Sequence, residues 1–277
     1  MADEAPIDEQ VQWRLAEGVA HITINAPDQG NALSPARRDR LTALFEQASG
    51  DVAVRAVVLT AAGERHFCTG AALGASRPAE RSRPANAPDR VMGDAARMIR
   101  RGWQRLVGSI LDCEKPVVGS INGTAAGGGA QLVLACDLVV MVETARLIEV
   151  FVRRGIMPDA GGAYLLPRLV GLHRAKELMF LGDDVSATDA LRLGIANHVV
   201  AASDLASRTA ELAGRLAAAP TRALALTKWL LNRSFESDRH TAFDEEAFAQ
   251  ELVNSTEDAR EGMTAFVERR DPTFRGW

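Results

Sequence analysis

The stretch that decides the fold is "INGTAAGGGAQLVLACDLVV", residues 121–140, in which three consecutive glycines, 127–129, stand before an apolar run. The β-branched segment "PVVGSI" precedes them, and Asn122-Gly123 is a strong turn signal. The apolar residues of "AQLVLACDLV" recur at i+3 and i+4 spacings, which predicts a buried helix over 130–139. Because consecutive glycines cost backbone entropy, three of them at a helix N-terminus need a physical reason.

Three known functions of glycine-rich loops can be tested against this stretch by their sequence patterns. A P-loop needs Gly-Lys-Ser/Thr after the glycines, a dinucleotide fingerprint needs G-x-G-x-x-G, and a nucleophile elbow needs G-x-S-x-G. None of these patterns is present in this stretch. Two interpretations stay open: an oxyanion hole, in which backbone N–H groups bind charge that develops on a carbonyl oxygen, or tight helix–strand packing that tolerates no side chain.

The rest of the first 200 residues alternates between strand and helix patterns. "VAHITI" (19–24) and "VRAVVLTA" (54–61) are typical of strands, the second of a strand buried on both faces. Between them, "LSPARRDRLTALFEQAS" (33–49) predicts a helix with Ser34 as its N-cap and Pro35 in its first turn. Such alternation predicts an α/β domain with largely parallel strands.

From about residue 201 onward the strand signals end. Three helices are predicted by pattern, and they must cover the core or a neighbouring subunit: 205–219, 221–234 and 244–254. The sequence thus predicts a core over 1–200 and a helical region over 201–277. The segment "ASRPAERSRPANAPDR" (75–90) has no periodicity and is expected to be either a mobile surface loop or a basic flap near the glycine loops.

Composition excludes several function classes. The net charge of −4 offers no general attraction to nucleic acid or to an anionic membrane. Three cysteines without a C-x-x-C pair and five scattered histidines predict reduced thiols and no metal site. No apolar run reaches membrane-spanning length, and the acidic N-terminus does not resemble a signal peptide. We therefore expect a cytoplasmic protein.

Five segments together resemble the crotonase family, also called the enoyl-CoA hydratase/isomerase family, and they occur in the family's order: "NAPDQGNALS", "VRAVVLTAAGERHFCTGAAL", "KPVVGSINGTAAGGGAQLVLACDL", "GIMPDAGGAYLLPRLVG" and "EGMTAFVERRDPTFRGW". The resemblance covers nearly the whole chain. It implies a spiral of ββα units followed by a helical region that builds homotrimers, often paired as hexamers. It implies an acyl-CoA thioester substrate, with coenzyme A as part of that substrate and no tightly bound cofactor.

The resemblance also implies an oxyanion hole made by the backbone N–H groups of Ala71 and Gly128. Hydratases of this family use two glutamates, and the matching positions here are Gln131 and Phe151. Gln131 can hydrogen-bond water but cannot exchange a proton near neutral pH, and Phe151 can do neither. Glu149, two residues before Phe151, would substitute only if the segment is extended and the reach is right.

Asp159, in "GIMPDAGG", matches an aspartate of relatives that resemble 1,2-epoxyphenylacetyl-CoA isomerases and Δ3,Δ2-enoyl-CoA isomerases. It would remove a proton from the α-carbon and return it at the γ-carbon. A free aspartate has a pKa of about 3.9, so burial would have to raise it. The alternative is that Asp159 caps or braces the turn beside Gly161-Gly162.

For substrate and coenzyme A contacts, the resemblance favours Leu73 and Phe151 within the chain. It further favours Phe266 and Arg269, donated across a subunit interface, with Arg37 as a compensating cation. For Arg37 a solvated helix face is an equal alternative.

Three functions follow as hypotheses. The first is an enoyl-CoA isomerase that uses Asp159. The second is a hydratase that uses Glu149, or Asp159 with Gln131 holding the water. The third is a catalytically silent acyl-CoA-binding protein.

Overall fold

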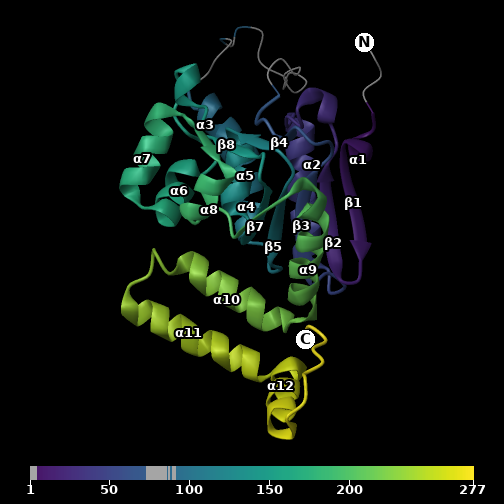
Figure 1. Cartoon of the computed structure of the whole chain (residues 1–277). Coiled ribbons are helices and arrows are strands. Elements are labelled where there is room, and N and C mark those ends of the chain that lie inside the picture. The colour runs from purple at the N-terminus through teal and green to yellow at the C-terminus, as the bar shows by residue number, and fades with distance from the viewer. Residues whose placement is uncertain (1–4, 73–85, 87, 89–91) are drawn as a thin grey trace.

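Two β-sheets form the centre of the protein, and the computed structural model describes residues 5–72, 86, 88 and 92–277 (Figure 1). The larger sheet has the order β1-β2-β3-β5-β7-β10 and the smaller one β4-β6-β8-β9. β1 pairs with β2 and β8 with β9 in antiparallel fashion, and every other pairing is parallel, as predicted. The strands are β1 (Val11–Ala16), β2 (Val19–Ile24), β3 (Ala56–Ala61), β4 (His66–Cys68), β5 (Val117–Ile121), β6 (Thr124–Ala126), β7 (Leu138–Val142), β8 (Arg146–Ile148), β9 (Asp184–Ser186) and β10 (His198–Val200).

Helices cover both sides of the larger sheet. α2 packs on β1 and β2 and against α4, whereas α9 lies across β3, β5 and β7 (Figure 1). The α-helices are α1 (Ile7–Gln10), α2 (Pro35–Gly50), α3 (Asp94–Ile99), α4 (Arg105–Leu111), α5 (Gly128–Ala135), α6 (Gly162–Val170), α7 (Leu172–Leu181), α8 (Ala187–Arg192), α9 (Leu205–Ala218), α10 (Thr221–Arg233), α11 (Arg239–Asn254) and α12 (Glu257–Glu268). A π-helical segment, η2 (Arg100–Gln104), joins α3 to α4, and short 3-10 turns are η1 (Pro27–Gln29), η3 (Val152–Arg154) and η4 (Ala202–Asp204).

Local sequence signals explain the start of α2 and the burial of β3. The Oγ atom of Ser34 accepts a hydrogen bond from the N–H of Arg37, and Pro35 occupies the first turn, as predicted. In β3, five of the six residues are buried, which fits its continuous β-branched composition.

The helix predicted over 130–139 is too long. α5 ends at Ala135, and Leu138 already begins β7, which lies between β5 and β10. Asp137 lies where the chain passes from α5 into β7 and is bound to the start of β5. Its N–H donates to the carbonyl oxygen of Val117 over 2.9 Å, and its carboxylate accepts from the Val117 N–H over 2.7 Å. Periodicity missed this boundary because a buried helix and a buried strand are both continuously apolar.

The predicted C-terminal helices are present as α9, α10 and α11, and α12 adds a helix that the patterns did not indicate. α9 covers the core with four buried apolar residues: Leu205, Leu212, Ala213 and Ala217. α10, α11 and α12 extend away from the sheets (Figure 1) and expose large apolar side chains: Leu231, Phe243, Phe248, Leu252, Met263, Phe266 and Val267. The domain boundary at residue 200 and the trimer remain predictions.

One buried lysine attaches α10 to the core. The Nζ atom of Lys228 lies 2.8 Å from the Asp137 carboxylate and also donates to the carbonyl oxygens of Ile110 and Lys115. Only 9% of the Lys228 side chain is exposed. The same carboxylate therefore orients β7 and anchors the first C-terminal extension.

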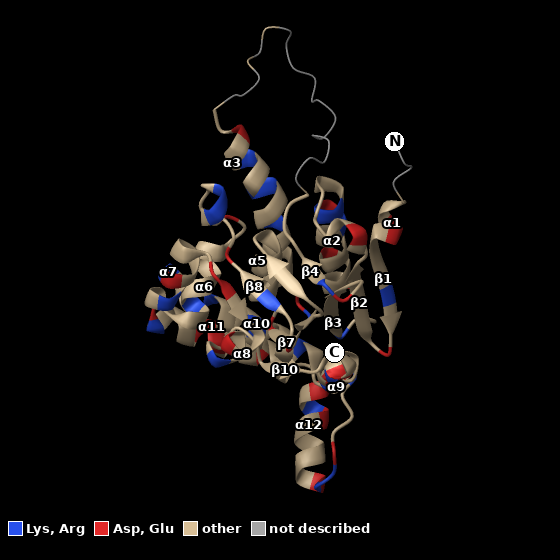
Figure 2. Cartoon of the chain, turned by 45° about the horizontal axis from the view of Figure 1, so that its top comes forward, with Lys and Arg blue, Asp and Glu red and all other residues tan. Residues whose placement is uncertain are grey.

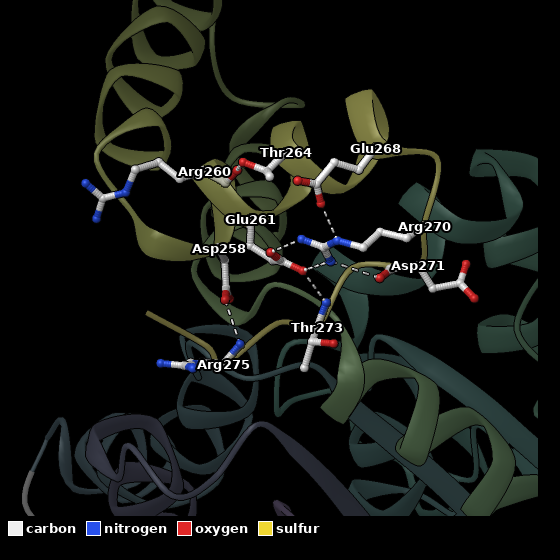
Figure 3. Close-up of polar contacts among 9 residues, drawn as sticks. All are labelled: Asp258, Arg260, Glu261, Thr264, Glu268, Arg270, Asp271, Thr273 and Arg275. Atoms are coloured by element: carbon white, nitrogen blue, oxygen red, sulfur yellow. Dashed lines mark hydrogen bonds and ion pairs between the residues drawn. The ribbon is translucent and has the colours of Figure 1, made fainter.

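Hydrogen bonds fold the last residues back along α12 (Figure 3). Arg270 binds both carboxylate oxygens of Glu261 over 2.6 and 2.8 Å, which lowers the pKa of Glu261 to about 2. The carboxylate of Asp258 accepts from the backbone N–H groups of Arg275 and Gly276 over 2.6 and 2.8 Å. The C-terminal tail is thus held against the helix that precedes it.

Arg55, just before β3, ties this tail to the core. Its guanidinium donates to the carbonyl oxygens of Phe274 and Ala219 over 2.9 and 2.8 Å and to the hydroxyl of Thr221 over 3.2 Å. One side chain therefore joins the larger sheet, the α9–α10 junction and the C-terminus.

Replacing Lys228 by Met should lower the free energy of unfolding by about 3 kcal/mol, because it leaves the Asp137 carboxylate, only 23% exposed, without its cation. Urea denaturation at pH 7 measures the change. The control is Arg222→Met on the same helix, which breaks an exposed ion pair with Glu114 and should cost less than about 1 kcal/mol. Equal losses in the two variants would contradict the anchoring role of Lys228.

Candidate functional site

The loop after β4 and the start of α5 approach each other more closely than side chains allow. A Cβ atom at Gly129 would lie 2.0 Å from the carbonyl oxygen of Cys68. A Cβ atom at Gly70, where φ is +92°, would lie 2.9 Å from the carbonyl oxygen of Ala126 and 3.2 Å from the nitrogen of Gly128. Tight packing therefore accounts for Gly129, and it brings the residue before Ala71 next to Gly128.

Where these loops meet, two backbone N–H groups have no partner in the part of the chain that the structure describes. The Leu33 N–H donates to the Gly70 carbonyl oxygen and the Ala72 N–H to the Leu33 carbonyl oxygen, so the intervening Ala71 N–H points away from this pairing. Gly128 is the first residue of α5. Within the described residues, neither the Ala71 nor the Gly128 N–H donates a hydrogen bond. Both stand near the positive end of the α5 dipole, which suits an anionic oxygen.

An indole ring covers Gly128. A Cβ atom at Gly128 would lie 2.3 to 2.6 Å from three ring carbons of Trp103, which is buried in η2. The guanidinium carbon of Arg38, on α2, lies 5.3 Å from the centre of the same ring. Sequence patterns singled out neither Trp103 nor Arg38, because their proximity to Gly128 depends on how α2 and η2 pack.

Gln131 and Glu149 form a buried pair. They are 0% and 1% exposed, and the Gln131 Nε2 atom lies 3.0 and 2.9 Å from the two carboxylate oxygens of Glu149. Burial raises the pKa of Glu149 to about 7, although the hydrogen bond from Gln131 opposes this rise. The pairing joins the first turn of α5 to the end of β8. Phe151 has α-helical backbone angles, φ −56° and ψ −47°, so the extended segment that the predicted substitution requires is absent at this position.

Asp159 lies in the loop between η3 and α6 and is half-buried. Burial raises the pKa of its carboxyl group, and the positive charge of Arg38 opposes this rise. Ala160 and Gly161 follow with φ values of +53° and +86°. The N-cap of α6 is Gly161 and no side chain caps this helix, so the capping interpretation of Asp159 is wrong. The turn is braced by the backbone carbonyl of Asp159, which accepts from the Gly162 N–H over 3.1 Å.

Arg37 does not lie on a solvated helix face. Its side chain is 1% exposed, its Nε atom donates to the Gln10 side chain over 2.7 Å, and its Nη1 atom donates to the Ala32 carbonyl oxygen over 2.7 Å. The guanidinium therefore binds groups inside the fold, which argues against the predicted contact with coenzyme A.

The other predicted contact residues lie in three different places. Phe151 is buried, with its Cζ atom 3.9 Å from where a Cβ atom of Gly127 would stand. Phe266 is 79% exposed on α12, and Arg269 ends that helix with a φ value of +58°. Leu73 and most of the basic segment 75–90 lie outside the described residues.

The described residues were also compared with the requirements of metal binding, thiolate chemistry and membrane crossing. These residues contain no cluster of three or more His, Cys, Asp or Glu that could hold a metal ion. Burial raises the pKa values of Cys68 and Cys136 to about 12, so neither is a ready thiolate. No helix in the described ranges combines the length and the apolar character that a membrane crossing needs.

Comparison with known proteins identifies the family. A family model described as enoyl-CoA hydratase/isomerase matches residues 14–276. The chain belongs to this family, the crotonase family. A 1,2-epoxyphenylacetyl-CoA isomerase of Escherichia coli is 35% identical over 262 residues, covering 95% of this chain and 97% of the relative. A short-chain-enoyl-CoA hydratase of Clostridium acetobutylicum is 35% identical over 254 residues, covering 91% of this chain and 92% of the relative.

Solved structures agree on the fold. The crystal structure of an enoyl-CoA hydratase from Bacillus anthracis has a TM-score of 0.86 at 32% identity, covering 97% of this chain and 100% of the other. The protein thus has the crotonase fold and is an enzyme of the enoyl-CoA hydratase/isomerase family. Hydratases and an isomerase both occur among its relatives.

Replacing Gly129 by Ala should lower the free energy of unfolding by about 3 kcal/mol or more, since the new methyl group would overlap the Cys68 carbonyl oxygen. Gly214→Ala is the control: nothing lies within 4 Å of its Cβ position on α9, and the change should stabilise the protein by up to about 1 kcal/mol. Urea denaturation measures both. A fully stable G129A variant would show that the close approach is not a constraint.

Replacing Glu149 by Gln should stabilise the protein at alkaline pH. The pKa of Glu149 is raised from an ordinary 4.5 to about 7, so folding disfavours its ionised form and stability falls as the pH rises through this interval. Between pH 5 and pH 8 the variant should gain about 2 to 3 kcal/mol relative to the parent. Unfolding free energies at both pH values test this. A difference that is independent of pH would contradict the assignment.

Proposed function

We propose that this enzyme is an enoyl-CoA isomerase that moves a carbon–carbon double bond along an acyl-CoA thioester. The Asp159 carboxylate takes a proton from the α-carbon of a 3-enoyl thioester, and the electron pair of that C–H bond passes into an enolate. The carboxylic acid then returns the proton to the γ-carbon, which yields the 2-enoyl thioester. Atoms and charge balance without water or any second reactant.

The observation that carries this proposal is the contrast between Asp159 and the two hydratase positions. Asp159 is half-buried, and burial raises its pKa toward a range in which a carboxylate is a useful base. The matching hydratase positions hold Gln131, an amide, and Phe151, which has no ionisable group. One carboxylate that both takes and returns a proton meets the needs of isomerisation, whereas water addition needs further acid and base work.

The unpaired N–H groups of Ala71 and Gly128 would hold the enolate oxygen. Backbone donors are fixed before the reaction begins, so they stabilise developing charge without reorganisation, and one such donor contributes about 3 to 4 kcal/mol to transition-state stabilisation. Trp103, packed against Gly128, would form a wall beside the thioester.

Coenzyme A would bind as part of the substrate rather than as a resident cofactor. Basic residues lie among acidic ones on α3 and at one end of α2 (Figure 2), where Arg97 pairs with Asp94 and Arg40 with Asp8. Leu73 and Phe151 would contact the substrate. Exposed Phe266 and Arg269 would reach a neighbouring subunit in a homotrimer or a dimer of trimers.

A hydratase is the second candidate, and the buried Gln131–Glu149 pair favours it. A carboxyl group with a pKa of about 7 can both give and take a proton at neutral pH. In this structure, however, Glu149 is 1% exposed and its carboxylate is occupied by Gln131. A water would have to displace that contact before Glu149 could act.

Replacing Asp159 by Asn should lower kcat for double-bond migration by about 100-fold or more, since the proton shuttle is lost. Binding of a non-reactive acyl-CoA should persist. Asp183→Asn, which changes an exposed aspartate, is the control and should keep full activity. Purified protein is incubated separately with 3-enoyl-CoA and 2-enoyl-CoA, and products are followed by mass and ultraviolet absorbance.

Each product pattern has one meaning. Migration of the double bond without a change in mass supports the isomerase, and loss of this activity in D159N assigns it to Asp159. A gain of one water from 2-enoyl-CoA overturns the isomerase proposal in favour of the hydratase. Tight acyl-CoA binding without turnover of either substrate overturns both and favours a silent acyl-CoA-binding protein.

A further inference from the structure

The side-chain amide of Gln131 fills the space between Glu149 and the start of α6. Its Nε2 atom donates to both carboxylate oxygens of Glu149, over 3.0 and 2.9 Å. On its other side, a Cβ atom at Gly162 would stand 2.6 Å from the Oε1 atom, 2.8 Å from Cδ and 2.9 Å from Nε2 of the amide. The amide therefore lies directly against the backbone of Gly162, and position 162 has no room for a side chain while the amide is there.

The amide of Gln131 has little freedom to move away from this contact. Gln131 is 0% exposed and stands in the first turn of α5, a helix in which every residue is buried. Its Oε1 atom is buried and has no hydrogen-bond partner among the described residues. Since no hydrogen bond of its own holds that oxygen, the place of the amide is set by Glu149 on one side and by contact with Gly162 on the other.

Gly162 in turn determines the course of the turn that carries Asp159. It is the first residue of α6, and its N–H donates to the carbonyl oxygen of Asp159 over 3.1 Å. Between the two, Ala160 and Gly161 have φ values of +53° and +86°, and Ala160 is 0% exposed. A residue other than glycine stays in this left-handed region only when its surroundings hold it there. The backbone of Asp159 is thus tied to the position of Gly162.

We propose that Gln131 is a positioning residue, whose amide, packed against Gly162, fixes the turn from which the Asp159 carboxylate acts. Glu149 is the anchor of that amide. The inference rests on the proposed function for its catalytic meaning, because Asp159 is the proton shuttle there. Its structural part, the dependence of the turn on the amide, concerns the protein without substrate. A neutral amide suits this place, since a carboxylate at position 131 would bring two acidic groups within hydrogen-bonding distance.

Four variants of the full chain test this inference. Gln131→Ala removes the amide, Gly162→Ala adds a methyl group where the amide lies, and the double variant Q131A/G162A carries both changes. Thr209→Val is the matched control, because it removes a buried polar contact elsewhere: Thr209, on α9, is 5% exposed and its hydroxyl donates to the Ser120 Oγ atom over 3.0 Å. Thermal unfolding establishes that each variant is folded. If G162A does not fold, Q131A alone still decides the inference through both readouts below.

The first readout needs no substrate. Hydrogen–deuterium exchange, followed by mass spectrometry, measures the protection of the backbone N–H groups in peptides that cover residues 159–166. In Q131A these peptides should exchange about fivefold faster or more while those of β2 keep the parent rate, because the start of α6 has lost its support. In T209V the exchange of 159–166 should not change. Unchanged exchange of this segment in Q131A would overturn the inference.

The second readout separates kcat from binding, with 3-enoyl-CoA as substrate. In Q131A and in G162A kcat should fall about tenfold or more, because a small displacement of a reacting group is enough for such a loss. The dissociation constant of a non-reactive acyl-CoA should stay within about twofold of the parent value, since the turn and not the binding surface has changed. T209V should keep the parent kcat. A parental kcat in Q131A would overturn the inference.

The double variant shows whether Gln131 and Gly162 act through one contact. In Q131A the space that a methyl group at position 162 needs is free, so the loss of kcat in Q131A/G162A should be close to the loss in Q131A alone. Losses that multiply would mean that the two positions act independently and would overturn the inference. If exchange rises in Q131A but the parent protein isomerises no 3-enoyl-CoA, the proposed function fails while the structural part of the inference stands.

Discussion

A lack of space between two backbone segments is the constraint on which this structure depends. The end of β4 and the start of α5 come so close that a methyl group at Gly129 would stand 2.0 Å from the Cys68 carbonyl oxygen. Only glycine permits this approach. Because the two segments meet there, Gly70 lies against Gly128, and the N–H groups of Ala71 and Gly128 find no hydrogen-bond partner among the described residues. A packing requirement thus places two backbone donors side by side, which is the kind of arrangement that can stabilise an anionic oxygen.

Two carboxyl groups of the candidate site, those of Glu149 and Asp159, lie in different surroundings. Glu149 is sealed behind Gln131, and burial raises its pKa to about 7. Asp159 is more open to solvent. Burial raises the pKa of its carboxyl group, and the positive charge of Arg38 opposes this rise. The carboxylate of Glu149 is hydrogen-bonded inside the fold, whereas that of Asp159 is partly open to solvent.

The C-terminal third connects this core to the surface expected to meet other subunits. Lys228 attaches α10 to the core through Asp137, and Arg55 binds both the α9–α10 junction and the returning tail. The tail in turn is held on α12 by Glu261 and Asp258 (Figure 3). These polar contacts fix α12 while its apolar side chains stay exposed, which is the arrangement that an assembly surface requires.

The sequence by itself determined the family, the α/β class and most elements, because glycine spacing, N-caps and β-branched runs are local properties of the chain. It also drew attention to Gln131, Glu149 and Asp159. It misplaced the end of α5, since buried helices and buried strands share one apolar pattern. Only the tertiary structure decided that Arg37 points inward, that Glu149 reaches Gln131, and that Trp103 packs over Gly128 with Arg38 beside its ring. Those relations join residues far apart in the chain, and they arise from packing between helices that no local pattern encodes.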